Sequence, residues 1–582
     1  MRRMQNEVWM HDAHNKRWLN FREPLEVLEA WQLAEVVPLL RWAEEATRQG
    51  RWVAGFLAYE AAPAFDAALD AHTPGHFPLA WFGVYKEPTV GADDHPPLNA
   101  SPLPKIDWQA ALTEAEYAHA ITHIKEHIAR GQTYQVNFTY RLRAEFNGEP
   151  FALFAQLVAN QPAPYAAFVD TGRFAICSAS PELFFERQGH TVRSKPMKGT
   201  AARGRTLTED EAQACALHHS EKNRAENVMI VDMIRNDLGR VAEVGSVRVP
   251  KLFETERYPT VWQMTSTVEA KTRASLTEIF AALFPCASIT GAPKRSTMKI
   301  IRALEGTPRG AYCGTLGFIQ PNGDAQFNVA IRTAVIDRER GAAEYGVGSG
   351  VVWDSDAADE WLECQIKARV LNTKRPKFEL LESLRWEPVT GYGLLERHLM
   401  RLKESAEYFA FELNLSEVRA RLEALAQTLA PAPHKVRVTV SHAGEIQCEA
   451  APLAENTSQP LTLAIAPTPI ASSNVFLFHK TTHRQVYDEA RAARPDSDEV
   501  VLWNERGEVT EALTNNVAVK LAGGWFTPPV LCGLLAGTLR AQLLEEGQLR
   551  ERVILLDELK HAEALAVFNS VRGWREAQLK VA

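Results

Sequence analysis

One stretch decides how this sequence is interpreted: Ser194-Lys195-Pro196-Met197-Lys198-Gly199-Thr200-Ala201-Ala202-Arg203-Gly204. Lys198 stands between an X-Pro step and a Gly-Thr pair, a pattern typical of a tight loop in which glycine lets the backbone approach a ligand. If burial and nearby cations lower the pKa of this lysine, its amine becomes a nucleophile at neutral pH. The same short pattern also occurs in basic surface turns, so the neighbouring segments must decide.

The composition is that of an ordinary globular protein, with 582 residues of which 46% are hydrophobic and 23% charged. This length favours several domains or two large ones. The net charge of -8 argues against a nucleic-acid partner, because neutralising phosphates requires a basic face. Small acidic substrates can still bind through local Arg and Lys side chains.

The sequence gives no sign of membrane insertion or export. No apolar run reaches the roughly 18 residues of a membrane-spanning helix, and no apolar signal-peptide core follows the first residues. We therefore expect a cytoplasmic protein with no membrane partner. The seven cysteines are scattered and never form a C-x-x-C pair, so neither a disulfide framework nor a thiolate zinc site is indicated.

Two carboxylates stand in positions where burial is expected. Glu182 follows a predicted strand, at a strand–turn junction upstream of Lys198. Glu226 enters the apolar run 228–231 of a predicted helix, and a partly buried carboxylate needs a partner or a metal ion.

A second pair of carboxylates lies on another predicted helix. Glu360 and Glu363 stand at i and i+3, and Lys367 follows one turn later. Such a pair is usually a solvated face. Together with Glu226 it could instead bind Mg2+, a hard cation that takes a few carboxylates and bridges to an anionic substrate.

Two segments rich in small residues complete the candidate site. Residues 285–294 form a predicted loop that opens a helix, where backbone N–H groups can meet an anion. Residues 345–350 form a second, glycine-rich predicted loop without the strand–loop–helix fingerprint of phosphate sites.

In this order the segments resemble the chorismate-utilising enzymes over about residues 110–372. The matching segments are Gln135-Val136-Asn137, 178–182, 225–237, 288–294, Tyr312, Arg332 and the helix with Glu360, Glu363 and Lys367. Within that superfamily, anthranilate and isochorismate synthases resemble one another in having alanine where this chain has Lys198. A lysine at this position is similar to component I of aminodeoxychorismate synthase.

The resemblance implies a fold and a set of ligands. The fold would be a two-sheet α/β sandwich. Mg2+ would bind the ring carboxylate of chorismate through Glu226, Glu360 and Glu363. The rest of the substrate would be bound by Thr200, Tyr312, Arg332, Gly348 and Lys367, with Arg332 and Tyr312 on the enolpyruvyl carboxylate.

The resemblance also implies a catalytic sequence. Lys198 would add to ring C2 while protonated Glu182 donates to the departing C4 hydroxyl, and ammonia would then attack C4 and displace the lysine. The family's usual histidine appears here as Gln263. An amide cannot relay protons as an imidazole does, which disfavours the pyruvate elimination of anthranilate synthases in this half.

The second half resembles a different family. A basic, Pro-bearing stretch indicates a linker over 373–379. Residues 380–582 resemble fold-type IV pyridoxal-phosphate enzymes, specifically aminodeoxychorismate lyases, through the segments 395–402, 478–482, 508–516 and 533–540. That resemblance implies that Lys480 forms the Schiff base, that Glu511 pairs with the pyridinium nitrogen, and that Arg401 and Thr538 hold the phosphate.

We therefore expect an α/β (α+β) fusion of two domains. The first spans 1–372, with an N-terminal lobe over 1–105 and a catalytic core over 110–372, and the second, an aminotransferase-like α/β domain, spans 380–582. The first would convert chorismate and ammonia to 4-amino-4-deoxychorismate, and the second would eliminate pyruvate to leave 4-aminobenzoate for folate biosynthesis. No cysteine lies in a Gly-X-Cys-X-Gly turn, so ammonia would come from solution or from a separate glutamine amidotransferase subunit. A homodimer through the second domain is a further partner arrangement to be tested.

Three alternatives stay open at this point. The first half could be an anthranilate or isochorismate synthase. The second half could be an amino-acid transaminase. One half could also serve only as a scaffold for the amidotransferase.

Overall fold

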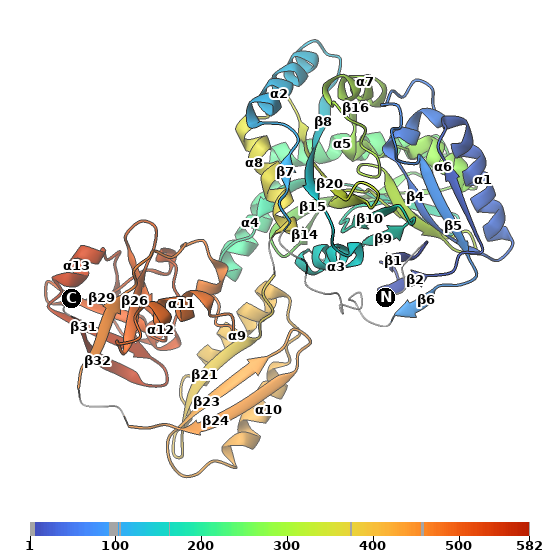
Figure 1. Ribbon diagram of the computed structural model, residues 1–582. Helices are drawn as coiled ribbons and strands as arrows, with labels where there is room; N and C mark the ends of the chain where they lie inside the picture. Colours follow the sequence, from blue (N-terminus) through green and yellow to red (C-terminus); the bar gives the residue numbers. More distant parts are fainter. Residues whose placement is uncertain are drawn as a thin grey trace. The chain divides into compact units, whose positions relative to one another are not determined.

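The computed structural model describes residues 6–91, 103, 106–161, 163–372, 375–455 and 459–580. The chain divides into two compact units (Figure 1). Unit 1 comprises Met1–Ala202 and Ala214–Arg375, and unit 2 comprises Arg203–Gln213 and Pro376–Ala582. The short segment 203–213 therefore groups with the second unit, which the sequence analysis did not anticipate. Residues 373 and 374 of the expected linker lie outside the described residues.

Unit 1 is built on two antiparallel sheets, each of ten strands within the described residues. The first sheet contains β16 (Gly291–Ala292), β8 (Gln135–Glu145), β20 (Ala342–Val351), β19 (Thr333–Asp337), β10 (Phe174–Ser178), β9 (Ala167–Asp170), β1 (Val8–Asp12), β2 (Arg17–Phe21) and β6 (Thr89–Gly91) in that order, with β7 (Gln109–Ala110) beside β8. The second contains β13 (Met197–Ala202), β15 (Val261–Lys271), β12 (Thr191–Lys195), β11 (Leu183–Gln188), β18 (Ala325–Asn328), β17 (Thr315–Ile319), β4 (Trp52–Leu57), β5 (Ala80–Tyr85) and β3 (Glu26–Ala30), with β14 (Arg248–Arg257) beside β15.

Apolar side chains fix the order of layers in unit 1. Phe21 of the first sheet shares one buried cluster with Phe56 and Trp81 of the second, so the two sheets pack face to face. The outer face of the first sheet is covered by α2 (Glu114–Ala129), α3 (Pro150–Asn160), α7 (Lys294–Leu304) and α8 (Ala357–Ala368). The outer face of the second sheet is covered by α1 (Leu33–Arg48), α5 (Glu221–Gly239) and α6 (Leu276–Leu283). The expected two-sheet α/β sandwich is confirmed.

The expectation that Lys198 lies on a tight loop is wrong. β12 and β13 both pair with β15 in one register, with Ser194 opposite Val268 and Met197 opposite Thr265. They form one strand interrupted at Pro196, which has no N–H for the ladder. The register shifts after Met197, and Gly199 has φ +99°. A β-bulge therefore turns Lys198 out of the regular alternation.

The glycine-rich segment 345–350 is likewise a strand and not a loop. It lies within β20, where Gly350 pairs with Asn137 of β8. A Cβ on Gly346 would collide with the ring of Tyr312. The glycines of this strand therefore make room for neighbouring side chains.

Unit 2 contains two further sheets. An antiparallel sheet holds β22 (Gly391–Tyr392), β21 (Leu380–Glu387), β23 (His434–Val440) and β24 (Ile446–Pro452). A mixed sheet holds β27 (Val509–Ala512), β26 (Glu499–Trp503), β25 (Leu461–Ile465), β32 (Gly573–Leu579), β31 (Ala564–Asn569), β28 (Asn516–Leu521), β29 (Gly524–Thr527) and β30 (Arg550–Glu551).

The helices of unit 2 cover one face of the antiparallel sheet and both faces of the mixed sheet. Two helices, α9 (Leu395–Phe409) and α10 (Leu415–Ala426), pack on the antiparallel sheet. Three helices, α11 (Gln485–Ala493), α12 (Thr538–Glu545) and α13 (Leu556–Lys560), contribute to the clusters of the mixed sheet. The helix α4 (Leu207–His219) begins within the segment assigned to unit 2 and ends in unit 1, because the boundary between the units lies after Gln213. Among the described residues, no helix combines the length and apolar character needed to cross a membrane.

A buried ion pair ties several elements of unit 1 together. Arg309 donates to both carboxylate oxygens of Glu305, at 2.9 Å and 2.6 Å. Its remaining N–H groups donate to the backbone oxygens of Ile289 at 2.7 Å and Asn137 at 2.8 Å. Glu305 also accepts the backbone N–H of Thr139 at 2.9 Å. The pair thus links α7, β8 and the loop before β16.

We expect Arg309→Leu to destabilise unit 1 by about 3–5 kcal/mol, because it leaves Glu305 buried without its cation. Arg143→Leu is the matched control, since Arg143 pairs with Glu344 on the surface and such pairs contribute about 0–1 kcal/mol. Denaturant unfolding, followed by hydrogen exchange of peptides from unit 1, measures both. Equal losses in the two variants would contradict this account of the buried pair.

Candidate active sites

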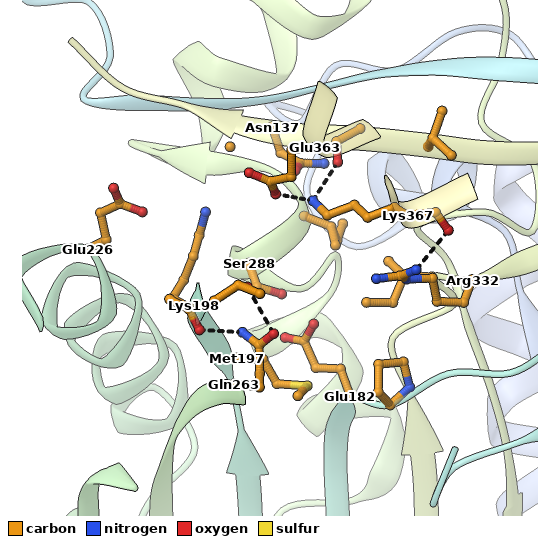
Figure 2. Close-up of a pocket in the computed structure, with 18 of the residues that line it drawn as sticks. Asn137, Glu182, Met197, Lys198, Glu226, Gln263, Ser288, Arg332, Glu363 and Lys367 are labelled. Carbon is orange, nitrogen blue, oxygen red and sulfur yellow. Dashed lines mark hydrogen bonds and ion pairs between the residues drawn. The ribbon is translucent and has the colours of Figure 1, made fainter. Parts of the chain in front are cut away.

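A pocket in unit 1 contains every residue that the sequence analysis assigned to the chorismate site (Figure 2). The residues come from both sheets and from two helices. They are Glu182, Lys198, Thr200, Glu226, Tyr312, Arg332, Gly348, Glu360, Glu363 and Lys367. Segments far apart in sequence therefore converge on one cavity.

The backbone around Lys198 is held from two sides. Asn227 of α5 donates to the backbone oxygen of Lys198 at 3.2 Å. Gln263 of β15 donates to the backbone oxygen of Gly199 at 2.9 Å and accepts from the hydroxyl of Thr200 at 3.0 Å. Figure 2 shows the Lys198 side chain extending into the pocket, with its amine between Glu226 and Glu363. The amide at position 263 thus fixes the bulge that aims the lysine.

Glu182 has the properties of a proton donor. It is 3% exposed, and its Oε1 atom has no hydrogen-bond partner among the described residues. Burial raises its pKa to about 7, against hydrogen bonds from Ser288 and from the backbone of Met197. The carboxyl group therefore keeps a proton to share at neutral pH.

The three other carboxylates, Glu226, Glu360 and Glu363, line the same pocket and interact with one another. Burial raises the pKa of Glu226 against the opposing charges of Lys198 and Lys222, and the negative charges of Glu360 and Glu363 add a smaller rise. Glu363 forms an ion pair with Lys367 at 2.5 Å, which outweighs burial and lowers its pKa. Glu360 accepts from the hydroxyl of Ser355 at 2.7 Å. Within the described residues, no group of three or more His, Cys, Asp or Glu side chains is arranged to hold a metal by itself.

Cationic and aromatic groups form the remaining wall. Arg332 has φ +54°, a left-handed conformation unusual for a long side chain. Its guanidinium donates to the backbone oxygen of Lys367 at 2.7 Å. Lys367 in turn donates to the backbone oxygen of Gly348 at 2.9 Å, and Tyr312 is buried beside them. This wall is suited to bind a carboxylate.

A second pocket, in unit 2, brings together Arg401, Lys480, Glu511 and Thr538. Burial and then Arg401 lower the pKa of Lys480 to about 8. Burial raises the pKa of Glu511 to about 7, although it accepts from the hydroxyl of Tyr487 at 2.7 Å. Thr538 is the first residue of α12, where free backbone N–H groups favour an anion. A lysine amine, a buried acid and an anion site therefore face one cavity.

Residues 5–373 match the model of the chorismate binding enzyme family, which is more than half of the chain. The chain belongs to the chorismate-binding enzyme family. Residues 379–579 match the model of class IV amino-transferases.

Relatives match the first of these regions. The aminodeoxychorismate synthase of Streptomyces griseus is 45% identical over 267 residues, which are 45% of this chain and 37% of that protein. Aminodeoxychorismate synthase component 1 of Bacillus subtilis (strain 168) is 42% identical over 263 residues, 45% of this chain and 56% of that protein. The chain thus spans about half the length of these relatives or less. Anthranilate synthase component I from Streptococcus pneumoniae covers 64% of this chain and 94% of its own, at 23% identity and a TM-score of 0.53, which shows a shared fold.

Some residues of this chorismate-binding enzyme were not singled out from its sequence. Ser288, which bonds to Glu182, was quoted only as part of a small-residue loop. In unit 2, Glu382 accepts from Arg401 at 2.9 Å and 2.7 Å and from His398 at 2.7 Å. Arg401 and His398 outweigh burial and lower the pKa of Glu382 to about 2. Only the apolar neighbours of Glu382 in β21 could have signalled its burial.

The raised pKa of Glu182 makes unit 1 less stable at high pH. The folded state binds more protons than the unfolded state between pH 4.5 and about 7, so stability falls over that window. Glu182→Gln removes this loss. We expect the variant to match the wild type at pH 4.5 and to exceed it by about 3 kcal/mol at pH 8.

Denaturant unfolding of the metal-free protein at the two pH values checks this expectation. Glu344→Gln, at an exposed position of β20, is the control and should show no such difference. A Glu182→Gln variant that is less stable than the wild type at pH 8 would contradict the raised pKa.

Proposed function

We propose that the chain makes 4-aminobenzoate from chorismate in two steps, one in each unit. The observation that carries the proposal is the position of Lys198, whose amine extends into the same pocket as Glu182 and the carboxylates of α5 and α8. A lysine aimed at a site between an acid and an anion-binding wall suits nucleophilic attack on an anionic substrate.

The first step is an amination of chorismate. The Lys198 amine forms a bond to ring C2 while Glu182 protonates the C4 hydroxyl, which leaves as water. Ammonia then forms a bond to C4, and the bond between C2 and Lys198 breaks. Arg332 and Tyr312 hold the enolpyruvyl carboxylate, with Thr200, Gly348 and Lys367 lining the rest of the site. The product, 4-amino-4-deoxychorismate, keeps its enolpyruvyl group.

Glu226, Glu360 and Glu363 would hold Mg2+ in this pocket. Carboxylate oxygens are the donors that Mg2+ prefers, and a cation would offset both the burial and the repulsion from Glu360 and Glu363 that raise the pKa of Glu226. Because the three side chains do not form a closed site by themselves, the substrate carboxylate and water would complete the coordination. The ion would supply charge neutralisation for the ring carboxylate.

The second step is an elimination in unit 2. The residues fit pyridoxal phosphate, because Lys480 is a buried amine of lowered pKa, Glu511 can pair with a ring nitrogen, and Arg401 and Thr538 can hold a phosphate. The bound cofactor would supply an electron sink. Lys480 takes the proton from the ring carbon that carries the amino group, and pyruvate is released as the ring becomes aromatic.

Ammonia would reach unit 1 from solution or from a separate glutamine amidotransferase subunit. The name of the Bacillus relative, a component 1, supports the second source. A homodimer through unit 2 and a role in folate biosynthesis belong to the same proposal.

Incubation with chorismate, ammonium, Mg2+ and pyridoxal phosphate should yield 4-aminobenzoate and pyruvate in equal amounts. We expect Lys198→Ala to lower the formation of 4-amino-4-deoxychorismate by at least about a hundredfold, because the nucleophile is removed. Chromatography of the products measures this. Lys299→Ala, at an exposed position of α7, is the control. Full activity of Lys198→Ala, or anthranilate as the main product, would refute the assignment.

Lys480→Ala should separate the two steps. We expect this variant to accumulate 4-amino-4-deoxychorismate without pyruvate, since the amine that takes the proton is gone. Borohydride reduction of the wild type with pyridoxal phosphate should label the peptide containing residue 480, as mass spectrometry can show. Lys403→Ala, exposed on α9, should behave as the wild type. Labelling of Lys480→Ala to the wild-type extent would rule out Lys480 as the cofactor lysine.

A further inference from the structure

Gln135, the first residue of β8, carries a buried amide whose role the proposed function does not explain. Its side chain is 0% exposed, and neither its Nε2 nor its Oε1 atom has a hydrogen-bond partner among the described residues. An unpaired buried polar atom costs about 1–3 kcal/mol. Both atoms are therefore expected to gain a partner when the amide turns over or when a ligand binds.

The neighbouring strand shows what the amide faces. A Cβ built on Gly350 of β20 would overlap the Nζ atom of Lys198 and would lie 2.7 Å from Nε2 of Gln135. The Lys198 amine and the Gln135 amide therefore both lie beside Gly350, in the space that a Cβ atom would occupy. Any larger residue at position 350 would push the lysine out of this place.

The charged groups around the amine come from other elements. Glu226 and Lys222 lie on α5, Glu363 lies on α8, and Glu182 precedes β11. Gln135 contributes an uncharged amide from β8, next to Gly350. Its amide can turn either its oxygen or its NH2 group towards the amine. The amide oxygen of Gln135 can accept one N–H of the Lys198 amine and leave the lone pair of the lysine nitrogen free.

We propose that Gln135 is a positioning residue for Lys198 and that Gly350 keeps the space in which the two groups meet. The amide oxygen accepts an N–H of the lysine, so that the lone pair of the amine is directed at the substrate ring. A carboxylate at position 135 would instead hold the amine as an ammonium ion, which is not a nucleophile. The inference rests on the proposed function of Lys198 as the nucleophile.

The first test separates positioning from binding. Gln135→Leu keeps an apolar side chain of similar size and removes both polar atoms. We expect kcat for ammonium-dependent amination of chorismate to fall about tenfold, the effect of one hydrogen bond, while KM for chorismate changes less than about twofold. Gln132→Leu, three residues earlier on an exposed turn, is the control. An unchanged kcat, or a KM that rises as much as kcat falls, would overturn the proposal.

The second test does not depend on the reaction. A small amine-reactive reagent, applied without substrate, should modify Lys198 at a rate that peptide mass spectrometry can compare with that of Lys222 in the same pocket. We expect Gln135→Leu and Gly350→Ala to lower this ratio at least about threefold, because one loses the acceptor and the other displaces the amine. Gly239→Ala, where a Cβ meets no atom within 4 Å, is the control.

The two tests fail in different ways. If the wild type forms no 4-amino-4-deoxychorismate, the proposed function is wrong, while the modification ratio still tests the contact with Gln135. If the wild type is active but the ratio is the same in all four proteins, the positioning role of Gln135 is wrong and the nucleophile assignment stands.

Discussion

Burial of ionisable side chains is the constraint on which both sites depend. Removal from water raises the pKa of Glu182 and of Glu511 to about 7 and lowers that of Lys480 to about 8. Burial thus raises the pKa values of the two acids and lowers that of the amine, which brings all three close to neutral pH. Groups whose pKa values lie near neutrality can exchange protons with a substrate at neutral pH. This desolvation lowers the stability of the folded protein, because the side chains are removed from water before any ligand is bound.

Glycines shape the unit 1 pocket, because they leave space for neighbouring side chains or allow a bulge. Gly199 takes a φ of +99° at the bulge that aims Lys198. Gly346 leaves room for the ring of Tyr312, and Gly350 leaves room for the lysine amine. Two of these glycines lie in β20, which pairs with β8 along ten residues of the first sheet. β20 therefore borders the pocket and leaves space there for the side chains of Tyr312 and Lys198.

The sequence predicts residue types and local elements better than their pairing. The spacing of the charged residues identified the helix with Glu360, Glu363 and Lys367, but other local patterns were misleading. The prediction of a tight loop at Lys198 failed, because its strand depends on pairing with β15, more than sixty residues away. The prediction of a loop at 345–350 failed likewise, because pairing with β8 makes this glycine-rich segment a strand. The grouping of 203–213 with unit 2 also depends on distant contacts, which no local pattern reports.

Glu182 and Glu511, whose pKa values are both raised by burial, differ in their hydrogen bonds. Oε1 of Glu182 has no partner among the described residues, so one oxygen of this carboxyl group is available to a ligand. Oε1 of Glu511 accepts from the Tyr487 hydroxyl and from the backbone N–H of Leu535 at 3.3 Å, so its orientation is fixed. A fixed carboxylate is suited to remain beside a cationic ring nitrogen. Similar pKa values therefore do not imply similar roles, since hydrogen bonding decides which acid can move its proton and which holds a charge in place.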